Sequence, residues 1–178
     1  MRLFLAMPIP AETRAILGSL PRDLPRARWV RMEQLHLTLR FLGERDAEIV
    51  DALSEALGPT VAAHPALEMR ASGLGTFGRR VLWAGLAPVE GLTALARDVG
   101  AALREVGVEA PDRPFAPHVT LARLGGGAGL GALLEAHGGW RGPLEVWDEV
   151  ALMRSELGSR GATHTVLRRF PLGGEPAG

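Results

Sequence analysis

The sequence predicts an α+β fold with largely antiparallel sheets, arranged as two related lobes that face one another. The chain has 178 residues, 47% of them apolar, which is enough to bury the core of one domain. Its predicted elements lack the steady βαβα alternation that is typical of parallel sheets. A similar polar strand also occurs once in each half of the chain. We therefore expect residues 1–178 to form a single domain of two intertwined lobes.

In the first half, proline and glycine mark where the predicted elements end. Pro8 and Pro10 end an apolar strand, Gly43 ends a second strand, and Asp46 can cap a helix. The predicted elements are a strand over 1–7, a helix over 11–20, a strand over 35–42, a helix over 46–64 and a hairpin over 67–87 that turns at Gly78.

In the second half, the clearest element is a helix over 90–107. Leu92, Leu95, Val99 and Leu103 recur at helical spacing, and Gly107 ends the pattern. The elements predicted after it are a strand over 118–124, a glycine-rich connector over 125–131, a short helix over 132–137, and strands over 144–157 and 163–172.

Composition excludes several kinds of chemistry. The chain has no cysteine, so disulfides, thiolate zinc sites and cysteine nucleophiles are excluded. It has no lysine either, which excludes a P-loop lysine and a Schiff-base lysine, and it has no tyrosine. All twenty basic residues are arginine, whose planar guanidinium can bind phosphate oxygens in a bidentate way. Because the net charge is zero, no overall basic field attracts nucleic acid.

No apolar run is long enough to span a membrane, and the first residues lack the longer apolar core of a signal peptide. We therefore expect a cytoplasmic monomer that does not bind membranes.

The most informative feature is a repeated motif, HLTL at 36–39 and HVTL at 118–121. In a strand, alternate side chains share a face, so each motif presents one imidazole and one hydroxyl on the face opposite its apolar residues. Core packing explains the apolar positions. It does not explain why both polar faces carry a histidine followed by a threonine.

This pair of motifs suits acid–base cleavage of a phosphate ester. Imidazole titrates near neutral pH, so one histidine can accept a proton while the other donates one. A threonine hydroxyl beside each histidine can donate a hydrogen bond to a phosphate oxygen as charge builds there. Neither histidine has neighbours at metal-ligand spacing, so we expect no metal and no cofactor.

At these residues the sequence resembles the two-histidine (2H) phosphoesterase superfamily. Within it, the sequence is most similar to the 2′-5′ RNA ligase, or RNA 2′,3′-cyclic phosphodiesterase, family. LHLTLRFLGE (35–44) and RPFAPHVTLAR (113–123) resemble its two signature blocks. RVLWAGL (80–86) resembles a central strand of the family, and SELGSRGATHTVL (155–167) resembles its closing hairpin.

The resemblance implies hydrolysis of an RNA 2′,3′-cyclic phosphate end to a 2′-phosphate, with reversible, ATP-independent 2′-5′ RNA ligation. It implies a fold of two pseudo-symmetric lobes flanked by helices, with an active-site cleft between them. It also implies that His36, Thr38, His118 and Thr120 are catalytic. In one assignment, His118 is the base that activates water and His36 is the acid that protonates the 3′-oxygen.

Five further residues are expected to bind the substrate. The resemblance favours Arg123 near the phosphate, although strand parity places it on the face opposite Thr120 unless a bulge intervenes. Arg80 is a weaker candidate, and Arg40 should share the face of Thr38 by strand parity. Phe77 can stack on a base. His164 stands where the family often has a tyrosine.

Two other functions fit the same residues. The substrate is then a small cyclic nucleotide or a 2′-5′ oligonucleotide, or the protein is a non-catalytic module that binds RNA ends. The binding module is disfavoured because holding a phosphate needs arginine rather than paired imidazoles.

Overall fold

Nine strands, paired throughout as antiparallel neighbours, form the sheet within residues 1–126, 129–159 and 161–176, which the computed structural model describes. The strands are β1 (Arg2–Pro8), β2 (Arg28–Trp29), β3 (His36–Glu44), β4 (Leu67–Phe77), β5 (Val81–Ala87), β6 (Val119–Arg123), β7 (Glu145–Trp147), β8 (Glu149–Gly158) and β9 (Gly161–Pro171). The helices are α1 (Ala11–Gly18), α2 (Ile49–Ala62), α3 (Glu90–Glu105) and α4 (Leu130–His137), with a 3-10 turn η1 (Met32–Gln34). The predicted connector 125–131 lies partly outside the described residues.

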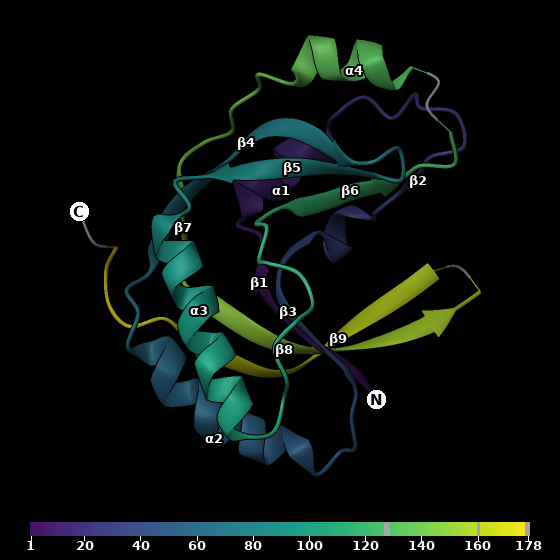
Figure 1. Ribbon diagram of the computed structural model, residues 1–178. Coiled ribbons are helices and arrows are strands. Elements are labelled where there is room, and N and C mark those ends of the chain that lie inside the picture. The colour runs from purple at the N-terminus through teal and green to yellow at the C-terminus, as the bar shows by residue number, and fades with distance from the viewer. Residues whose placement is uncertain (127–128, 160, 177–178) are drawn as a thin grey trace.

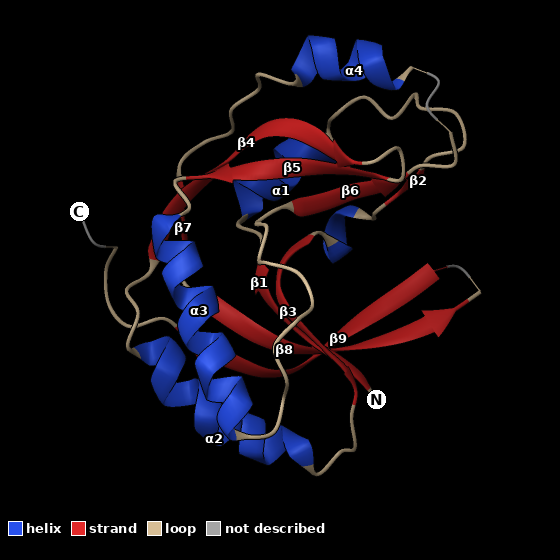
Figure 2. Cartoon of the chain, in the orientation of Figure 1, coloured by secondary structure: helices blue, strands red, loops and turns tan. Residues whose placement is uncertain are grey.

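The sheet consists of two lobes that meet at one strand pair. The strand order is β7-β4-β5-β6-β3-β1-β8-β9, and β2 pairs with the free side of β6. The first lobe therefore holds β7, β4, β5, β6 and β2, and the second lobe holds β3, β1, β8 and β9. The two groups are separate in Figure 1, and as red strands in Figure 2. They are joined where Leu37 of β3 pairs with Val119 of β6.

Each lobe has its own pair of helices. In Figure 1, α2 and α3 lie against each other beside the second lobe, and they contact β9 and β3 respectively. The shorter α1 and α4 lie with the first lobe, where α4 contacts β4. The predicted α+β class with antiparallel sheets in two lobes is thus confirmed.

One continuous hydrophobic core extends through both lobes. It includes Leu82 and Leu121 from the first lobe together with Leu37 and Leu152 from the second. The apolar stripe predicted for α3 is buried, as Leu92, Leu95, Val99 and Leu103 all belong to this core.

The predicted strand over 144–157 is in fact two strands, which is a correction to the sequence analysis. The chain leaves the first lobe at Asp148, because β7 pairs with β4 whereas β8 pairs with β1 and β9. The Asp148 carbonyl accepts a hydrogen bond from the Leu172 backbone N–H (2.8 Å) at this crossing. The apolar pattern continues across the crossing, so it does not reveal the change of partner.

β7 also completes the amino-terminal end of α1. The Glu145 carboxylate accepts hydrogen bonds from the backbone N–H groups of Thr13 (2.7 Å) and Glu12 (3.3 Å), and from the Thr13 hydroxyl. A residue that is distant in sequence therefore satisfies donors that the first turn of a helix leaves unpaired.

Candidate active site

β3 and β6 bring both His-x-Thr motifs to one face of the sheet. Leu37 and Val119, the paired central residues of the two motifs, are fully buried. Their neighbours on either side, which are the histidine and the threonine of each motif, point to the opposite face and are half-buried. We call this face, on the side of the sheet away from Leu37 and Val119, the histidine face. One histidine comes from each lobe, as the sequence predicted.

A β-bulge in β6 turns Arg123 onto the histidine face. The register between β5 and β6 shifts between Thr120 and Ala122, which leaves Leu121 as the extra residue. Leu121 and Ala122 are both buried as a result. Arg123 pairs with Val81 and points to the same side as Thr120. The bulge resolves the conflict between strand parity and the family resemblance in favour of Arg123.

A matching bulge in β3 has the opposite effect on Arg40. The register with β1 shifts between Thr38 and Arg40, so Leu39 is the extra residue and Arg40 pairs with the buried Leu5. The Arg40 guanidinium donates a hydrogen bond to the Glu109 carbonyl, in the loop after α3. The expectation that Arg40 shares the face of Thr38 is therefore wrong, because parity fails across a bulge.

The two histidines are held in the same way. The Nδ1–H of His36 donates to the Gln34 carbonyl (2.7 Å), and the Nδ1–H of His118 donates to the Ala116 carbonyl (2.6 Å). A carbonyl oxygen can only accept, so the proton of a neutral ring must be on Nδ1. Nε2 is therefore the nitrogen that can exchange a proton with a substrate in both rings.

His36 lies in an aromatic cluster of the second lobe. Its ring centroid is 5.1 Å from Phe4 and 5.1 Å from His164, and the two imidazoles meet edge to face at 83°. Phe4 and His164 are also in contact, with centroids 5.0 Å apart. The structure thus places the predicted residue His164 directly beside a catalytic candidate. It also adds Phe4, which the sequence analysis treated only as part of an apolar strand.

His118 has an aromatic neighbour of its own in the first lobe. The Phe77 ring meets it edge to face, with centroids 4.7 Å apart and planes at 88°. Trp83 lies behind Phe77 at 5.5 Å, and its indole crosses so close to Gly75 that a Cβ there would be 2.3 Å from the ring. Phe77 is nevertheless 42% exposed, so it both supports His118 and leaves ring surface available. Trp83 was missed from the sequence, although its register opposite Thr120 places it on the histidine face.

Burial lowers the pKa of two of the clustered imidazoles, those of His36 and His164. It lowers the pKa of His36, since desolvation disfavours the charged ring; the hydrogen bond to Gln34 acts against this, and the charge of His118 lowers the pKa further. Burial also lowers the pKa of His164, and the charge of His36 adds to that effect. His36 is therefore biased toward its neutral form in the free protein.

Arg80 and Arg123 lie near each other at the end of the β5–β6 pair. Arg123 pairs with Val81, the residue after Arg80, and the Arg80 carbonyl accepts a hydrogen bond from Leu124 N–H (2.8 Å). Both side chains are exposed, and neither forms an ion pair with any residue that the structure describes. Both remain available to an anion, and both stay candidates.

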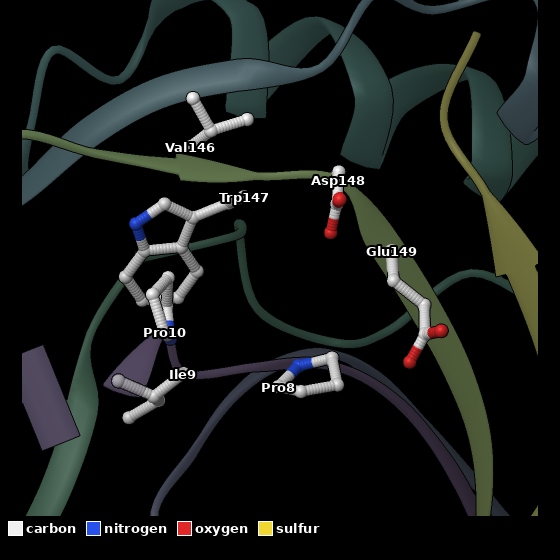
Figure 3. Close-up of a pocket in the computed structure, with 7 residues that line it drawn as sticks. All are labelled: Pro8, Ile9, Pro10, Val146, Trp147, Asp148 and Glu149. Atoms are coloured by element: carbon white, nitrogen blue, oxygen red, sulfur yellow. The ribbon is translucent and has the colours of Figure 1, made fainter. Parts of the chain in front are cut away.

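A cavity beside the end of β1 does not suit a phosphate. It measures about 300 Å³ and lies between Pro8–Pro10 and Val146–Glu149. Pro8 pairs with His36, but Figure 3 shows the Asp148 and Glu149 carboxylates on its opposite wall. These carboxylates would repel a phosphate. Across the described ranges, no three His, Asp or Glu side chains gather as metal ligands, and no helix is long and apolar enough to cross a membrane.

Comparisons with known proteins identify the family of the chain and agree with its fold. Residues 13–158 match the family model of the 2′-5′ RNA ligase superfamily. An RNA 2′,3′-cyclic phosphodiesterase of Thermus thermophilus is 40% identical over 98% of this chain and 92% of its own length. One of Geobacillus stearothermophilus is 35% identical over 67% of this chain, which spans only 41% of that longer relative.

Among solved structures, one of a Thermus thermophilus protein superposes with a TM-score of 0.83 at 32% identity, covering 98% of this chain and all of the other. The predicted family and the prediction of an enzyme are thereby confirmed. The chain belongs to the 2′-5′ RNA ligase superfamily.

Proposed function

We propose that this protein hydrolyses RNA 2′,3′-cyclic phosphate ends to 2′-phosphates, using His36 and His118 as an acid–base pair. The observation that carries the proposal is the matched geometry of two imidazoles, which offer Nε2 from adjacent strands on one sheet face. The names of the relatives supply the substrate class, RNA with a 2′,3′-cyclic phosphate end.

In the proposed reaction, water attacks the phosphorus and the bond from phosphorus to the 3′-oxygen breaks. One imidazole takes a proton from the water, and the other gives a proton to the leaving 3′-oxygen. The products are a 2′-phosphate and a 3′-hydroxyl. Thr38, Thr120 and Arg123 stabilise the charge that develops on the non-bridging oxygens.

The same site can join RNA ends without ATP. A 5′-hydroxyl then takes the place of water, and attack with loss of the 3′-oxygen forms a 2′-5′ phosphodiester. The energy of the strained cyclic phosphate is conserved in the new linkage, so no nucleotide is consumed.

The electrostatics favour His36 as the base in hydrolysis and His118 as the acid, the reverse of the assignment made from the sequence. A general base must be neutral before the reaction, and burial lowers the pKa of His36. A substrate with sulfur in place of the 3′-oxygen tests this, because a thiolate leaves without protonation. Such a substrate should restore turnover to His118→Ala but not to His36→Ala. Rescue of His36→Ala alone would return the roles to the first assignment.

The activity itself is tested with an RNA oligonucleotide that ends in a 2′,3′-cyclic phosphate, incubated in EDTA, with the product identified by mass spectrometry and phosphatase sensitivity. A 2′-phosphate is expected, and each of His36→Ala and His118→Ala should lower kcat by about 10²–10⁴-fold. A 3′-phosphate product would contradict the regiochemistry. Absence of turnover by the unaltered protein would favour the module that only binds RNA ends.

A further inference from the structure

A second cavity, of about 480 Å³, opens on the first lobe, away from the histidines. Its polar lining includes Arg70 and Ser72 from β4, Arg141 from the segment before β7, and one carboxylate, Glu68. Two guanidinium groups and a hydroxyl against a single carboxylate leave a net positive site. Such a donor set suits a phosphodiester.

The backbone fixes the position of Arg141 in this cavity. On one side of it, Trp140 accepts a hydrogen bond through its carbonyl from the Gly73 N–H (2.7 Å). On the other side, the Gly142 N–H donates to the Ala71 carbonyl (2.8 Å). The segment that carries Arg141 is therefore hydrogen-bonded to β4 on both sides of this residue. These bonds fix the backbone position from which the Arg141 side chain extends.

Neither Arg70 nor Arg141 makes an ion pair with another residue in the parts of the chain that the structure describes. Several other arginines of this protein do have a carboxylate partner, such as Arg168 with Asp51 and Arg169 with Glu149. The guanidinium groups of Arg70 and Arg141 are thus available to bind an anion in the cavity.

The cavity and the catalytic candidates lie on the same side of the first lobe. Arg70 pairs with Ala87 of β5, and Thr120 pairs with Trp83 of the same strand. Ala87 and Trp83 are four residues apart, an even spacing, so their side chains share a face. At about 3.3 Å per residue, the two positions are roughly 13 Å apart along β5.

We propose that this cavity is a subsite for a backbone phosphodiester of the RNA strand whose cyclic end lies between the two histidines. The inference deepens the proposed function and rests on it. A nucleoside 2′,3′-cyclic phosphate has a single phosphate, which cannot occupy both places at once. The subsite therefore makes the preferred substrate an oligonucleotide rather than a mononucleotide.

The test compares two substrates, a nucleoside 2′,3′-cyclic phosphate and a short oligonucleotide with the same cyclic end. In the double variant Arg70→Ala/Arg141→Ala, kcat/KM for the oligonucleotide should fall at least about tenfold, while that for the mononucleotide stays within about twofold. The salt dependence for the oligonucleotide should also become shallower, by about 0.7 in the log–log slope for each phosphate that the variant no longer binds. The matched control is Arg97→Ala/Arg168→Ala, which removes two arginines from the side of α2 and α3 and should leave both substrates unchanged.

A second variant keeps the test decisive if the double variant does not fold. Glu68→Gln removes the only carboxylate from the cavity lining, so it should lower KM for the oligonucleotide and leave the mononucleotide unaffected. An equal loss for both substrates in the double variant, or no loss for either, would overturn the subsite.

Failure of the proposed function gives a different result, because the unaltered protein then hydrolyses neither substrate. In that case, fluorescence anisotropy with a labelled oligonucleotide decides the matter. Weaker binding by the double variant than by its control supports the subsite, and equal binding overturns it.

Discussion

Two single extra residues, Leu39 and Leu121, decide which arginine reaches the histidine face. Each follows a His-x-Thr motif and shifts the strand register by one. After the shift, the fifth residue beyond each histidine faces the site, which is Phe41 in one lobe and Arg123 in the other. Phe41 is 72% exposed and its ring centroid lies 6.1 Å from Phe4, so the second lobe presents an aromatic ring where the first presents a cation.

The bulges predict opposite results for two arginine variants. Arg123→Ala should lower kcat/KM by about 10²-fold, because a charged donor to the phosphate is lost. Arg40→Ala should keep kcat/KM within about threefold and instead lower the free energy of unfolding by about 1 kcal/mol, through loss of its hydrogen bond to Glu109. Steady-state kinetics and urea titration measure the two effects. A large kinetic defect in Arg40→Ala with normal stability would contradict the placement.

The histidine cluster predicts a pH dependence of stability. His36 and His164 both have a pKa below the ordinary 6.5, so the unfolded chain takes up protons first as the pH falls. Stability should therefore be full above pH 6.5 and should fall as the pH drops through that value toward the lowered pKa of the folded state. His164→Phe removes one such group, so its melting temperature should drop less between about pH 7.5 and 5.5 than that of the unaltered protein. An equal or larger drop in the variant would count against a buried neutral pair.

At the residue scale, the sequence predicted which side chains of a regular strand share a face, because that depends only on the alternation along the strand. Strand parity correctly placed His36 on the same face as Thr38 and His118 on the same face as Thr120. The pairing of β3 with β6, which brings the two pairs to one face, is a result of the structure. Parity could not locate the bulges, because Leu39 and Leu121 are ordinary apolar residues whose extra position depends on the neighbouring strand. It could not find Phe4 either, because its contacts with His36 and His164 are made between strands distant in sequence. Trp83 contacts Phe77 within the predicted hairpin, but its place opposite Thr120 depends on the pairing of β5 with β6.

At the scale of elements, α1 depends on a strand from far along the chain. Its amino-terminal donors bind the Glu145 carboxylate of β7, and Thr13 is fully buried at this contact. The helix starts after Pro10, and no side chain of its own caps it. The sequence predicted the helix from its pattern. That pattern contains no sign of the distant cap, and the division of 144–157 into β7 and β8 was missed for the same reason.

Removing the cap should weaken the protein without direct effect on the histidines. Glu145→Ala should lower the free energy of unfolding by about 1–2 kcal/mol, because the buried Thr13 loses its acceptor. Glu135→Ala, an exposed position on α4, is the matched control and should change little. Chemical denaturation followed by circular dichroism measures the free energy of unfolding of both variants. Equal losses in the two would show that the Glu145 cap does not stabilise the protein more than an exposed carboxylate does.

At the scale of the whole molecule, two lobes share one core although they meet at a short strand pair. The hydrophobic cluster includes residues of both lobes, so opening one lobe exposes apolar surface of the other. From the length and the twin motifs, the sequence analysis expected a single domain of two lobes, and the shared core supports that expectation. The junction itself could not be predicted, because a pairing between β3 and β6 leaves no local pattern.

The shared core predicts one cooperative unfolding transition. All four tryptophans, Trp29, Trp83, Trp140 and Trp147, lie with the first lobe, whereas the two longest helices, α2 and α3, flank the second. Tryptophan fluorescence and far-UV circular dichroism therefore follow different lobes, and their denaturation curves should coincide. Two separated midpoints would show that the lobes unfold independently.

The hydrogen bonds that fix Nδ1 in both rings also limit how the protein recovers after each reaction. With Nδ1 already committed to a carbonyl, each imidazole gains and loses its mobile proton at one nitrogen, and no relay passes through the ring. Under the proposed mechanism, a completed hydrolysis leaves His36 charged and His118 neutral. That inverted pair is the one needed for the reaction in reverse. Hydrolysis and ligation both start from the original pair, because the 5′-hydroxyl simply takes the place of water. Every turnover of either reaction therefore ends with the two Nε2 atoms exchanging protons with the solvent before the next can begin.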